Sequence, residues 1–285
     1  MTREPAVAGE FYENTFEKLN KQIEDCFYSK FGPGDLPVKR TGKKIKGVIV
    51  PHAGYFFSGA CGAWAYKEIA ESVFPRAYLI LGPNHYGLGS GLSIEDWKTP
   101  FGLVKVEKDM VLGIKEKTGL KIAEENHVAE HSLEVQLPFL QYANRDKLQD
   151  IRIIPLVIGR DLDYYETGKK LADFLKNKDI VVIISSDFTH YGPSYRYVPF
   201  STDIPNRITA LDNGAIEHIM KLDTNGFKEY VNKTGITICG YMPILIFLSI
   251  IEQSETKPNL LMHYTSGDVL GSYKNSVSYV SIVFK

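Results

Sequence analysis

The chain has 285 residues, of which 44% are hydrophobic and 24% are charged, and its formal net charge at pH 7 is −1. This composition is typical of a globular protein, and the near-neutral charge argues against a nucleic-acid-binding protein or a protein that binds anionic membranes. The longest apolar run, residues 242–251, is about half the ~20 residues that a membrane span requires. The first residues lack the apolar run of a signal peptide. We therefore expect neither a nucleic-acid partner nor a membrane partner.

Apolar β-rich runs alternate with helical patterns along the chain. In chain order we predict a helix at 15–28, a linker-like segment at 31–44, a strand at 45–50, a helix at 58–72, a strand at 77–81, short strand-like pieces within 92–106, helices at 109–118 and 132–142, a strand at 151–158, a helix at 162–175, a strand at 180–185, helices at 207–222, 225–231 and 241–252, and strands at 260–264 and 277–284. Continuous Val/Ile runs between helices indicate strands that are covered on both faces. We predict an α/β fold with a mixed central sheet, helices on both faces, and a single domain spanning 1–285.

Cysteine is scarce and odd in number, with Cys26, Cys61 and Cys239 as the three residues. This argues against a disulfide framework and for a reducing, cytoplasmic compartment. Cys26 and Cys61 fall in helical patterns and are predicted to pack in the core. Cys239 directly precedes an apolar helix, where free N–H groups and the helix dipole favour a thiolate and lower its pKa. An inert buried thiol is the alternative for Cys239.

Polar residues follow three of the predicted core strands. VIV runs into PHAGY with His52, LIL runs into GPNHYG with His85, and IIS runs into SDFTHYG with Asp187 and His190. In open α/β sheets, ligands bind outside the carboxyl ends of the strands. We therefore predict that these four side chains line one active site.

A metal ion is the simplest ligand for such a set. Histidine nitrogen and thiolate sulfur form a borderline-soft ligand set that suits Fe(II), Zn(II) or copper. Three protein ligands leave a coordination position open, as catalytic metal sites do. We predict that His52, His85 and Cys239 bind one divalent metal ion. Their spacing matches no compact metal motif, so this prediction depends on their convergence in the fold.

The segment HVAEH contains His127, Glu130 and His131 in the H-x-x-E-H order of the inverted zinc-protease motif. That motif requires both histidines on one helical face. Ser132 is a good N-cap, so the helix is expected to begin after it and to leave His127 in the preceding loop. This disfavours a protease. Glu130, His131 and Glu134 are predicted to orient ligands in the pocket or to take part in catalysis, and a solvated helix start is the alternative.

Six motifs in this order resemble the Memo family, whose prokaryotic relatives are named AmmeMemoRadiSam system protein B: RxPAVAGxFY, PHAGYFFSG, GPNH, EHSLEVQLPFL, SSDFTHYG and ICGYMP. The resemblance implies the fold of the class III extradiol ring-cleaving dioxygenases, which hold non-haem Fe(II) with two histidines and a glutamate. It implies that His52 and His85 occupy the histidine positions, that Cys239 replaces the carboxylate, and that His190 is the acid/base residue. The thiolate departs from that ligand set and changes the redox behaviour of a bound iron.

Three functions agree with these features. The first is a redox enzyme of dioxygenase type that uses Fe(II), or else copper, with His190 transferring a proton and Asp187 orienting or charging the pocket. The second is a non-catalytic pocket at the strand ends that binds a peptide or a small anion. The third is a hydrolase in which Zn(II) activates water. The family name further implies AMMECR-type and radical-SAM proteins as partners in a shared system. The natural substrate stays open.

Overall fold

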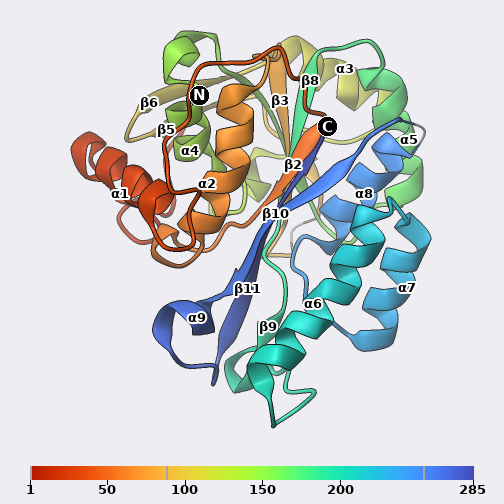
Figure 1. Ribbon diagram of the computed structural model, residues 1–285. Helices are drawn as coiled ribbons and strands as arrows, with labels where there is room; N and C mark the ends of the chain where they lie inside the picture. The colour runs from red at the N-terminus through yellow and green to blue at the C-terminus, as the bar shows by residue number, and fades with distance from the viewer. Residues whose placement is uncertain (1, 88, 253) are drawn as a thin grey trace.

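The computed structural model describes residues 2–87, 89–252 and 254–285, and a large mixed β-sheet runs through it (Figure 1). The strand order is β1-β5-β6-β7-β3-β8-β2-β11-β10, with β4 paired to β7 and β9 paired to β11. The strands are β1 Thr2–Arg3, β2 Gly47–Val50, β3 Ala77–Pro83, β4 Gly91–Leu92, β5 Asp96–Thr99, β6 Gly102–Val106, β7 Arg152–Ile158, β8 Ile180–Ser185, β9 His190–Tyr191, β10 Pro258–Thr265 and β11 Ser276–Phe284.

The middle of the sheet is parallel and its far end is antiparallel. Strand β8 pairs in parallel with both β3 and β2, and β3 pairs in parallel with β7. Strand β11 pairs antiparallel with β2 and with β10. Nearly every residue of β2, β3 and β8 is buried, as expected for strands with helices on both faces. The predicted α/β class and mixed sheet are confirmed.

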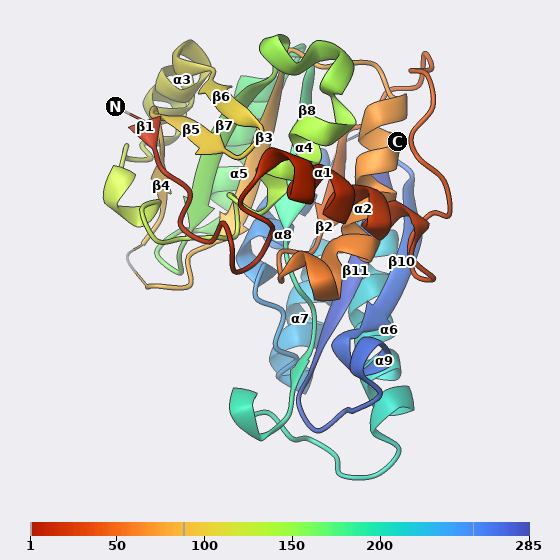
Figure 2. The same cartoon turned by 90° about the vertical axis from the view of Figure 1, so that its left-hand side faces the viewer.

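Helices cover both faces of the sheet. One layer contains α1 Phe16–Tyr28, α2 Tyr55–Glu71 and α4 Gln136–Ala143, which lie toward the viewer in Figure 2. The other layer contains α3 Lys108–Thr118, α5 Tyr164–Leu175, α7 Thr224–Thr234 and α8 Tyr241–Ile251, with α6 Ile204–Met220 packed on α7 and β10. Helix α9 Ser266–Leu270 and three short 3₁₀ helices, η1 Glu124–Asn126, η2 Arg145–Asp150 and η3 Pro193–Tyr195, complete the elements. No helix among the described residues has the length and apolar character needed to cross a bilayer.

Two features of the secondary structure differ from expectation. The helix predicted at 132–142 begins only at Gln136, and Ser132 does not cap it. The Ser132 hydroxyl instead donates to the carbonyl of Pro83 at the end of β3, at 2.9 Å, which holds residues 132–135 as turns. The short elements β1, β9, α9 and the three 3₁₀ helices were not predicted, because two-residue pairings and single helical turns leave no periodic pattern in the sequence.

The sheet order brings three strand ends together. Strand β8 lies between β3 and β2, and all three run in the same direction. Their carboxyl ends, near Val50, Pro83 and Ser185, therefore share one edge of the sheet. The segments that carry the predicted site residues leave the sheet at this edge.

Candidate metal centre

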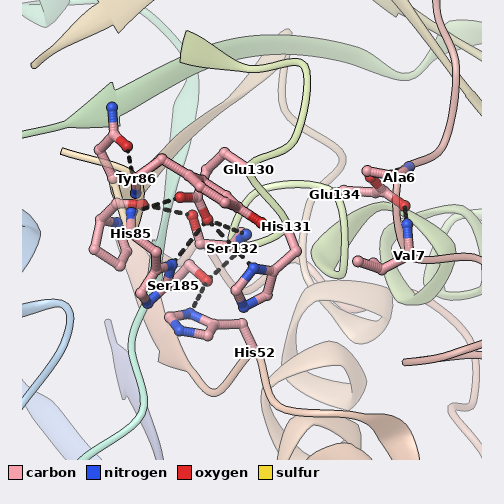
Figure 3. Close-up of polar contacts among 12 residues, drawn as sticks. Ala6, Val7, His52, His85, Tyr86, Glu130, His131, Ser132, Glu134 and Ser185 are labelled. Atoms are coloured by element: carbon pink, nitrogen blue, oxygen red, sulfur yellow. Dashed lines mark hydrogen bonds and ion pairs between the residues drawn. The ribbon is translucent and has the colours of Figure 1, made fainter. Parts of the chain in front are cut away.

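Three imidazoles converge at this edge of the sheet (Figure 3). His52 follows β2, His85 follows β3, and His131 lies in the turns that precede α4. One ring nitrogen from each lies within 4.8 Å of the others. The ring centroids of His85 and His131 are 4.7 Å apart and stacked, and His52 meets both rings edge-on at 5.2 and 5.5 Å. The three nitrogens can therefore hold one metal ion.

Hydrogen bonds set the tautomer of His52. The Nδ1 atom lies 2.8 Å from the Ser185 hydroxyl, which gives its single proton to the carbonyl of Ser132 at 2.6 Å. The Gln136 side-chain amide also donates to this hydroxyl. The Ser185 oxygen can therefore only accept from the imidazole, so His52 carries its proton on Nδ1 and leaves the Nε2 lone pair free.

A buried carboxylate orients His85. Glu130 Oε1 lies 2.9 Å from His85 Nδ1, and Oε2 accepts the His85 backbone N–H at 2.6 Å. Burial would raise the pKa of Glu130, but hydrogen bonds from the His85 ring and from the backbone of Ser132 and His85 outweigh it and lower the pKa to about 2. The ionised carboxylate accepts a hydrogen bond from Nδ1–H of His85, so in the neutral ring the lone pair is on Nε2. A carboxylate behind a histidine is a common way of orienting a metal ligand.

Burial keeps two of the imidazoles neutral. Loss of solvent lowers the pKa of His131 to about 4, assisted by the neighbouring His85 ring and opposed by the carboxylates of Glu130 and Glu134. Burial, with the nearby His85 and His131, also lowers the pKa of His52 well below its usual value. Metal ions bind the neutral imidazole, so these rings need not release a proton at pH 7. The donor set therefore fits a divalent ion.

Cys239 lies against His52. Its Sγ atom is 3.2 Å from His52 Nε2, and the backbone N–H of Asp187 donates to the sulfur at 3.1 Å. Nitrogen and sulfur ligands of one tetrahedral ion lie about 3.5 Å apart, so this position is compatible with a shared ion. The cluster of possible metal ligands consists of His52, His85 and His131, and it does not include Cys239. The role of Cys239 as a ligand stays a prediction.

The expected low thiol pKa of Cys239 is wrong. Burial and the charge of Asp187 raise its pKa well above the usual value, although the N–H groups of Asp187 and Gly240 act in the opposite direction. Desolvation of the thiolate outweighs the helix N-terminus. A protonated thiol agrees with the tautomer of His52, because its S–H can donate to the free Nε2 lone pair.

Asp187 and His190 occupy different positions. Asp187 is buried, and its Oδ1 atom accepts the backbone N–H of His52 at 2.8 Å, so it contacts the main chain that carries the imidazole. The Nδ1 atom of His190 lies 2.8 and 3.0 Å from the carbonyls of Phe188 and Thr237. Carbonyls only accept, so Nδ1 carries a proton, and in the neutral ring of His190 the lone pair is on Nε2.

A cleft opens beside these residues. It has a volume of about 1120 Å³, and His85, His190 and Cys239 line it. Much of the remaining wall is apolar or aromatic, from Ile158, Tyr195, Ile236, Ile238, Tyr241 and Met242, and Arg160 supplies a cation. His127 lies elsewhere, buried with its Nε2 atom 3.0 Å from the carbonyl of Gly91. The geometry of the inverted protease motif is therefore absent.

Several residues of this site were missed in the sequence. Ser185 and Gln136 orient His52, and their only signal was their place beside the chemical residues in SSDFTHYG and EHSLEVQLPFL. Arg3 contacts the turn that carries His131. Phe11 contacts the His131 ring. Both residues lie in the RxPAVAGxFY motif, to which the sequence analysis assigned no functional role. Their roles depend on contacts between distant parts of the chain.

Comparisons with known proteins agree with the fold and the motifs. A family model described as "Memo-like protein" matches residues 3–283. A curated "MEMO1 family protein" of Sulfurisphaera tokodaii is 39% identical over 293 residues, covering 100% of this chain and 99% of that protein. Another from Saccharolobus solfataricus is 40% identical over 299 residues with the same coverage. The solved structure of an uncharacterized Escherichia coli K12 protein has a TM-score of 0.53 at 15% identity, covering 84% of this chain and 99% of that chain. At this identity the likeness concerns the fold alone.

Proposed function

Since the chain belongs to the Memo-like protein family and carries a three-histidine cluster, we propose that it is a metal-dependent enzyme with one divalent ion at His52, His85 and His131. Cys239, which adjoins His52, is the fourth candidate ligand. The observation that carries this proposal is the convergence of three imidazoles beside a large cleft, two of them with Nδ1 engaged by the protein so that the lone pair is on Nε2. Cofactor sites are commonly concave and lined by apolar and aromatic groups with a few polar ones.

Iron is the metal that we propose, with copper or zinc as alternatives. Imidazole nitrogen suits all three metals, and a neighbouring sulfur suits copper and zinc. Iron comes first because the resemblance to the extradiol dioxygenases implies it. A bound iron or copper ion supplies a redox couple and a Lewis acid. The reaction class that we propose is therefore oxidation of an organic molecule, of the dioxygenase type that the resemblance implies.

His190 is the proposed acid/base residue. Its ring lines the same cleft as His85 and Cys239, and its Nδ1–H is held by two carbonyls. The free Nε2 lone pair can accept a proton from a substrate hydroxyl in the cleft and return it later. Asp187 is proposed to act through the backbone of His52, whose N–H it accepts.

A binding pocket without catalysis is the second candidate. The cleft is larger than a three-ligand metal site needs, and Arg160 and Asp161 place one charge of each sign among apolar and aromatic walls. A small anion or the side chain of a peptide suits such a surface. Ligand binding that is equally strong in metal-free protein and in His52→Ala would support this second candidate over the enzyme.

Metal binding and turnover are tested together. We expect anaerobic reconstitution with Fe(II) to load one ion per chain and to give oxygen uptake with some member of a panel of phenolic compounds. His52→Ala and His85→Ala should each lose tight binding, whereas His218→Ala, a histidine that pairs with Asp223 away from the site, should retain it. Equal metal content in all variants would contradict the proposed centre. Zinc in protein from its native host would favour the hydrolase instead.

A further inference from the structure

The three imidazoles are not held in the same way. His52 is anchored by the Ser185 hydroxyl and His85 by the Glu130 carboxylate. For the His131 ring no hydrogen bond is found among the described residues, and its Nδ1 atom lies 3.6 Å from Glu130 Oε1. Packing holds this ring instead, between the stacked His85 ring and the ring of Phe11, whose centroid is 4.8 Å away. The position of His131 therefore depends on its turn and on Phe11.

Arg3 clamps the turn that carries His131. Its guanidinium donates to the carbonyl of His127 at 2.6 Å, to the carbonyl of Glu130 at 2.8 Å, and to the Glu134 carboxylate at 2.7 Å. These three acceptors lie on both sides of His131 in the chain. The guanidinium also lies over the ring of Trp97, 4.1 Å from its centroid. A buried, planar donor group of this kind fixes the path of the main chain that it contacts.

Glu134 connects the same turn back to the N-terminus. Its buried carboxylate accepts the backbone N–H groups of Ala6 at 2.8 Å and Val7 at 3.1 Å, and the hydroxyl of Tyr12 at 2.7 Å (Figure 3 shows the first two residues). Its charge is balanced by Arg3. Residues 2–12, which we call the N-terminal strap, are therefore tied along their length to the turn that carries His131.

The strap also reaches the second side of the centre. The carbonyl of Phe11 accepts the backbone N–H of Tyr55 at 2.8 Å. Tyr55 begins α2, three residues after His52. Phe11 therefore contacts His131 with its ring and the His52 segment with its main chain.

We propose that the N-terminal strap is a positioning element of the metal centre, in which Phe11 holds the His131 ring and Arg3 holds its turn. This inference rests on the proposed metal site. Neither residue is a ligand or a catalytic residue, because each acts through His131. The strap supplies the support that Ser185 and Glu130 give to the other two imidazoles.

Phe11→Ala tests the strap without breaking a buried ion pair. We expect Zn(II) or Co(II) affinity, measured by competition with a chromophoric chelator, to fall about 10-fold, the effect of losing a group that orients a ligand. Phe11→Leu should restore most of it. Phe16→Ala is the matched control, because Phe16 is exposed and meets the ring of Phe101 at 5.1 Å, away from the site. Its affinity should not change. Equal affinity in Phe11→Ala and the wild type would overturn the proposal.

A double-mutant cycle separates positioning from general damage. In the His131→Ala background, Phe11→Ala should weaken metal binding no further, because the ring that Phe11 positions is already gone. An equal loss in both backgrounds would overturn the role of Phe11 as a support of His131. Arg3→Lys should behave like Phe11→Ala, since an ammonium group keeps the charge but cannot contact three acceptors in one plane.

A second measurement keeps this inference distinct from the proposed function. If wild-type protein binds no metal, the proposed function fails, but the strap can still be tested in metal-free protein by NMR of ¹⁵N-labelled histidine. The His131 signals, identified by their loss in His131→Ala, should shift in Phe11→Ala and not in Phe16→Ala. Unchanged His131 signals in Phe11→Ala would overturn the strap proposal regardless of metal binding.

Discussion

Ser185 shows how one hydroxyl can select a tautomer. It donates to the carbonyl of Ser132 and accepts from His52 and Gln136, so all of its hydrogen-bonding capacity is used inside the protein. Because Ser185 is buried at the end of β8, no water can replace these partners. Ser185 therefore directs the lone pair of His52 to Nε2, although Ser185 itself would not contact the metal.

We expect Ser185→Ala to weaken both the fold and the metal centre. Loss of the hydroxyl leaves buried polar partners unsatisfied and should lower the free energy of unfolding by about 1–3 kcal/mol. Metal affinity should fall at least about 10-fold, because the proton of His52 is no longer held on Nδ1. Urea denaturation and chelator competition measure the two effects.

Ser249→Ala provides the matched control for this prediction. Ser249 is also buried, but its hydroxyl donates within α8 to the carbonyl of Leu245. We expect this variant to keep the metal affinity of the wild type. A similar loss of affinity in Ser249→Ala would mean that Ser185 acts only through stability.

Glu130 contributes charge as well as shape. Both oxygens of Glu130 accept hydrogen bonds from N–H groups of His85 and Ser132. Glu130→Gln keeps the size of the side chain, but it replaces one of these acceptors with an amide NH₂ group, which cannot accept. We expect metal affinity to fall by about 10- to 100-fold. Glu124→Gln is a suitable comparison, since Glu124 accepts from Ser93 and Ile94 outside the site. Equal metal affinity in Glu130→Gln and the wild type would contradict the role assigned to this carboxylate.

At the scale of elements, the site depends on how closely the turn before α4 approaches β3. Gly82 lies in β3, and a Cβ atom placed on it would come within 2.5 Å of Leu133 and 2.7 Å of the Ser132 hydroxyl. The missing side chain lets the turn lie directly on the strand. This close approach brings His131 beside His85, although the two are 46 positions apart in the chain (131 − 85).

Gly82→Ala should separate these two elements. We expect the extra methyl group to lower the free energy of unfolding by about 1–3 kcal/mol, as overpacking does, and to weaken metal binding by moving His131. Gly62→Ala in α2 is the control, because the nearest atoms to its Cβ would be at ordinary distances of 3.7 and 3.9 Å. In a helix this change should stabilise by about 0.5–1 kcal/mol. Unfolding curves and metal titrations of the two variants give the comparison.

At the scale of the whole molecule, buried histidines make stability depend on pH. His127 is buried against Trp97, and burial lowers its pKa to about 4, although the hydrogen bond to Gly91 acts in the opposite direction. The unfolded chain takes up this proton near pH 6.5, whereas the folded protein takes it up only near pH 4. The contribution of this pKa shift to the free energy of unfolding is therefore complete above pH 6.5. It falls as the pH drops toward 4, and it is lost below pH 4. It amounts to about 3 kcal/mol.

Replacement of His127 isolates this contribution. His52 and His131 shift in the same direction, so the prediction concerns the difference between wild type and His127→Leu, both metal-free. The variant loses the hydrogen bond to Gly91 at every pH, but its free energy of unfolding should fall less steeply between pH 6.5 and 4. Parallel curves from urea denaturation would contradict the assignment.

We propose that residues 1–285 form a single domain, and the core supports this. One cluster of buried apolar residues extends from Leu19 in α1 through the central strands to Phe284 in β11. A second, small cluster lies around Cys61 and Tyr264. A chain whose main core extends through most of its elements is expected to unfold cooperatively. Tryptophan fluorescence and far-ultraviolet circular dichroism should then report the same transition.

The sequence by itself determined the α/β class, most of the long elements, and the polar residues that follow β2, β3 and β8. These properties depend on runs of β-branched residues and on helical periodicity, which act over a few neighbouring residues. The strand at 180–185 was predicted with its observed bounds. His52, His85, Asp187 and His190 follow strand ends for the same local reason.

Only the tertiary structure decided which of these side chains meet. His131 joins the imidazole cluster because β3 lacks a side chain at Gly82 and because Arg3, 131 positions from Glu134, clamps its turn. The pKa of Cys239 is raised because surrounding protein partly excludes solvent from the sulfur and because Asp187 lies beside it, which no local pattern reports. Such contacts join segments that are far apart in the chain, and their energies depend on burial and on distance in space. A pattern along the sequence contains neither quantity.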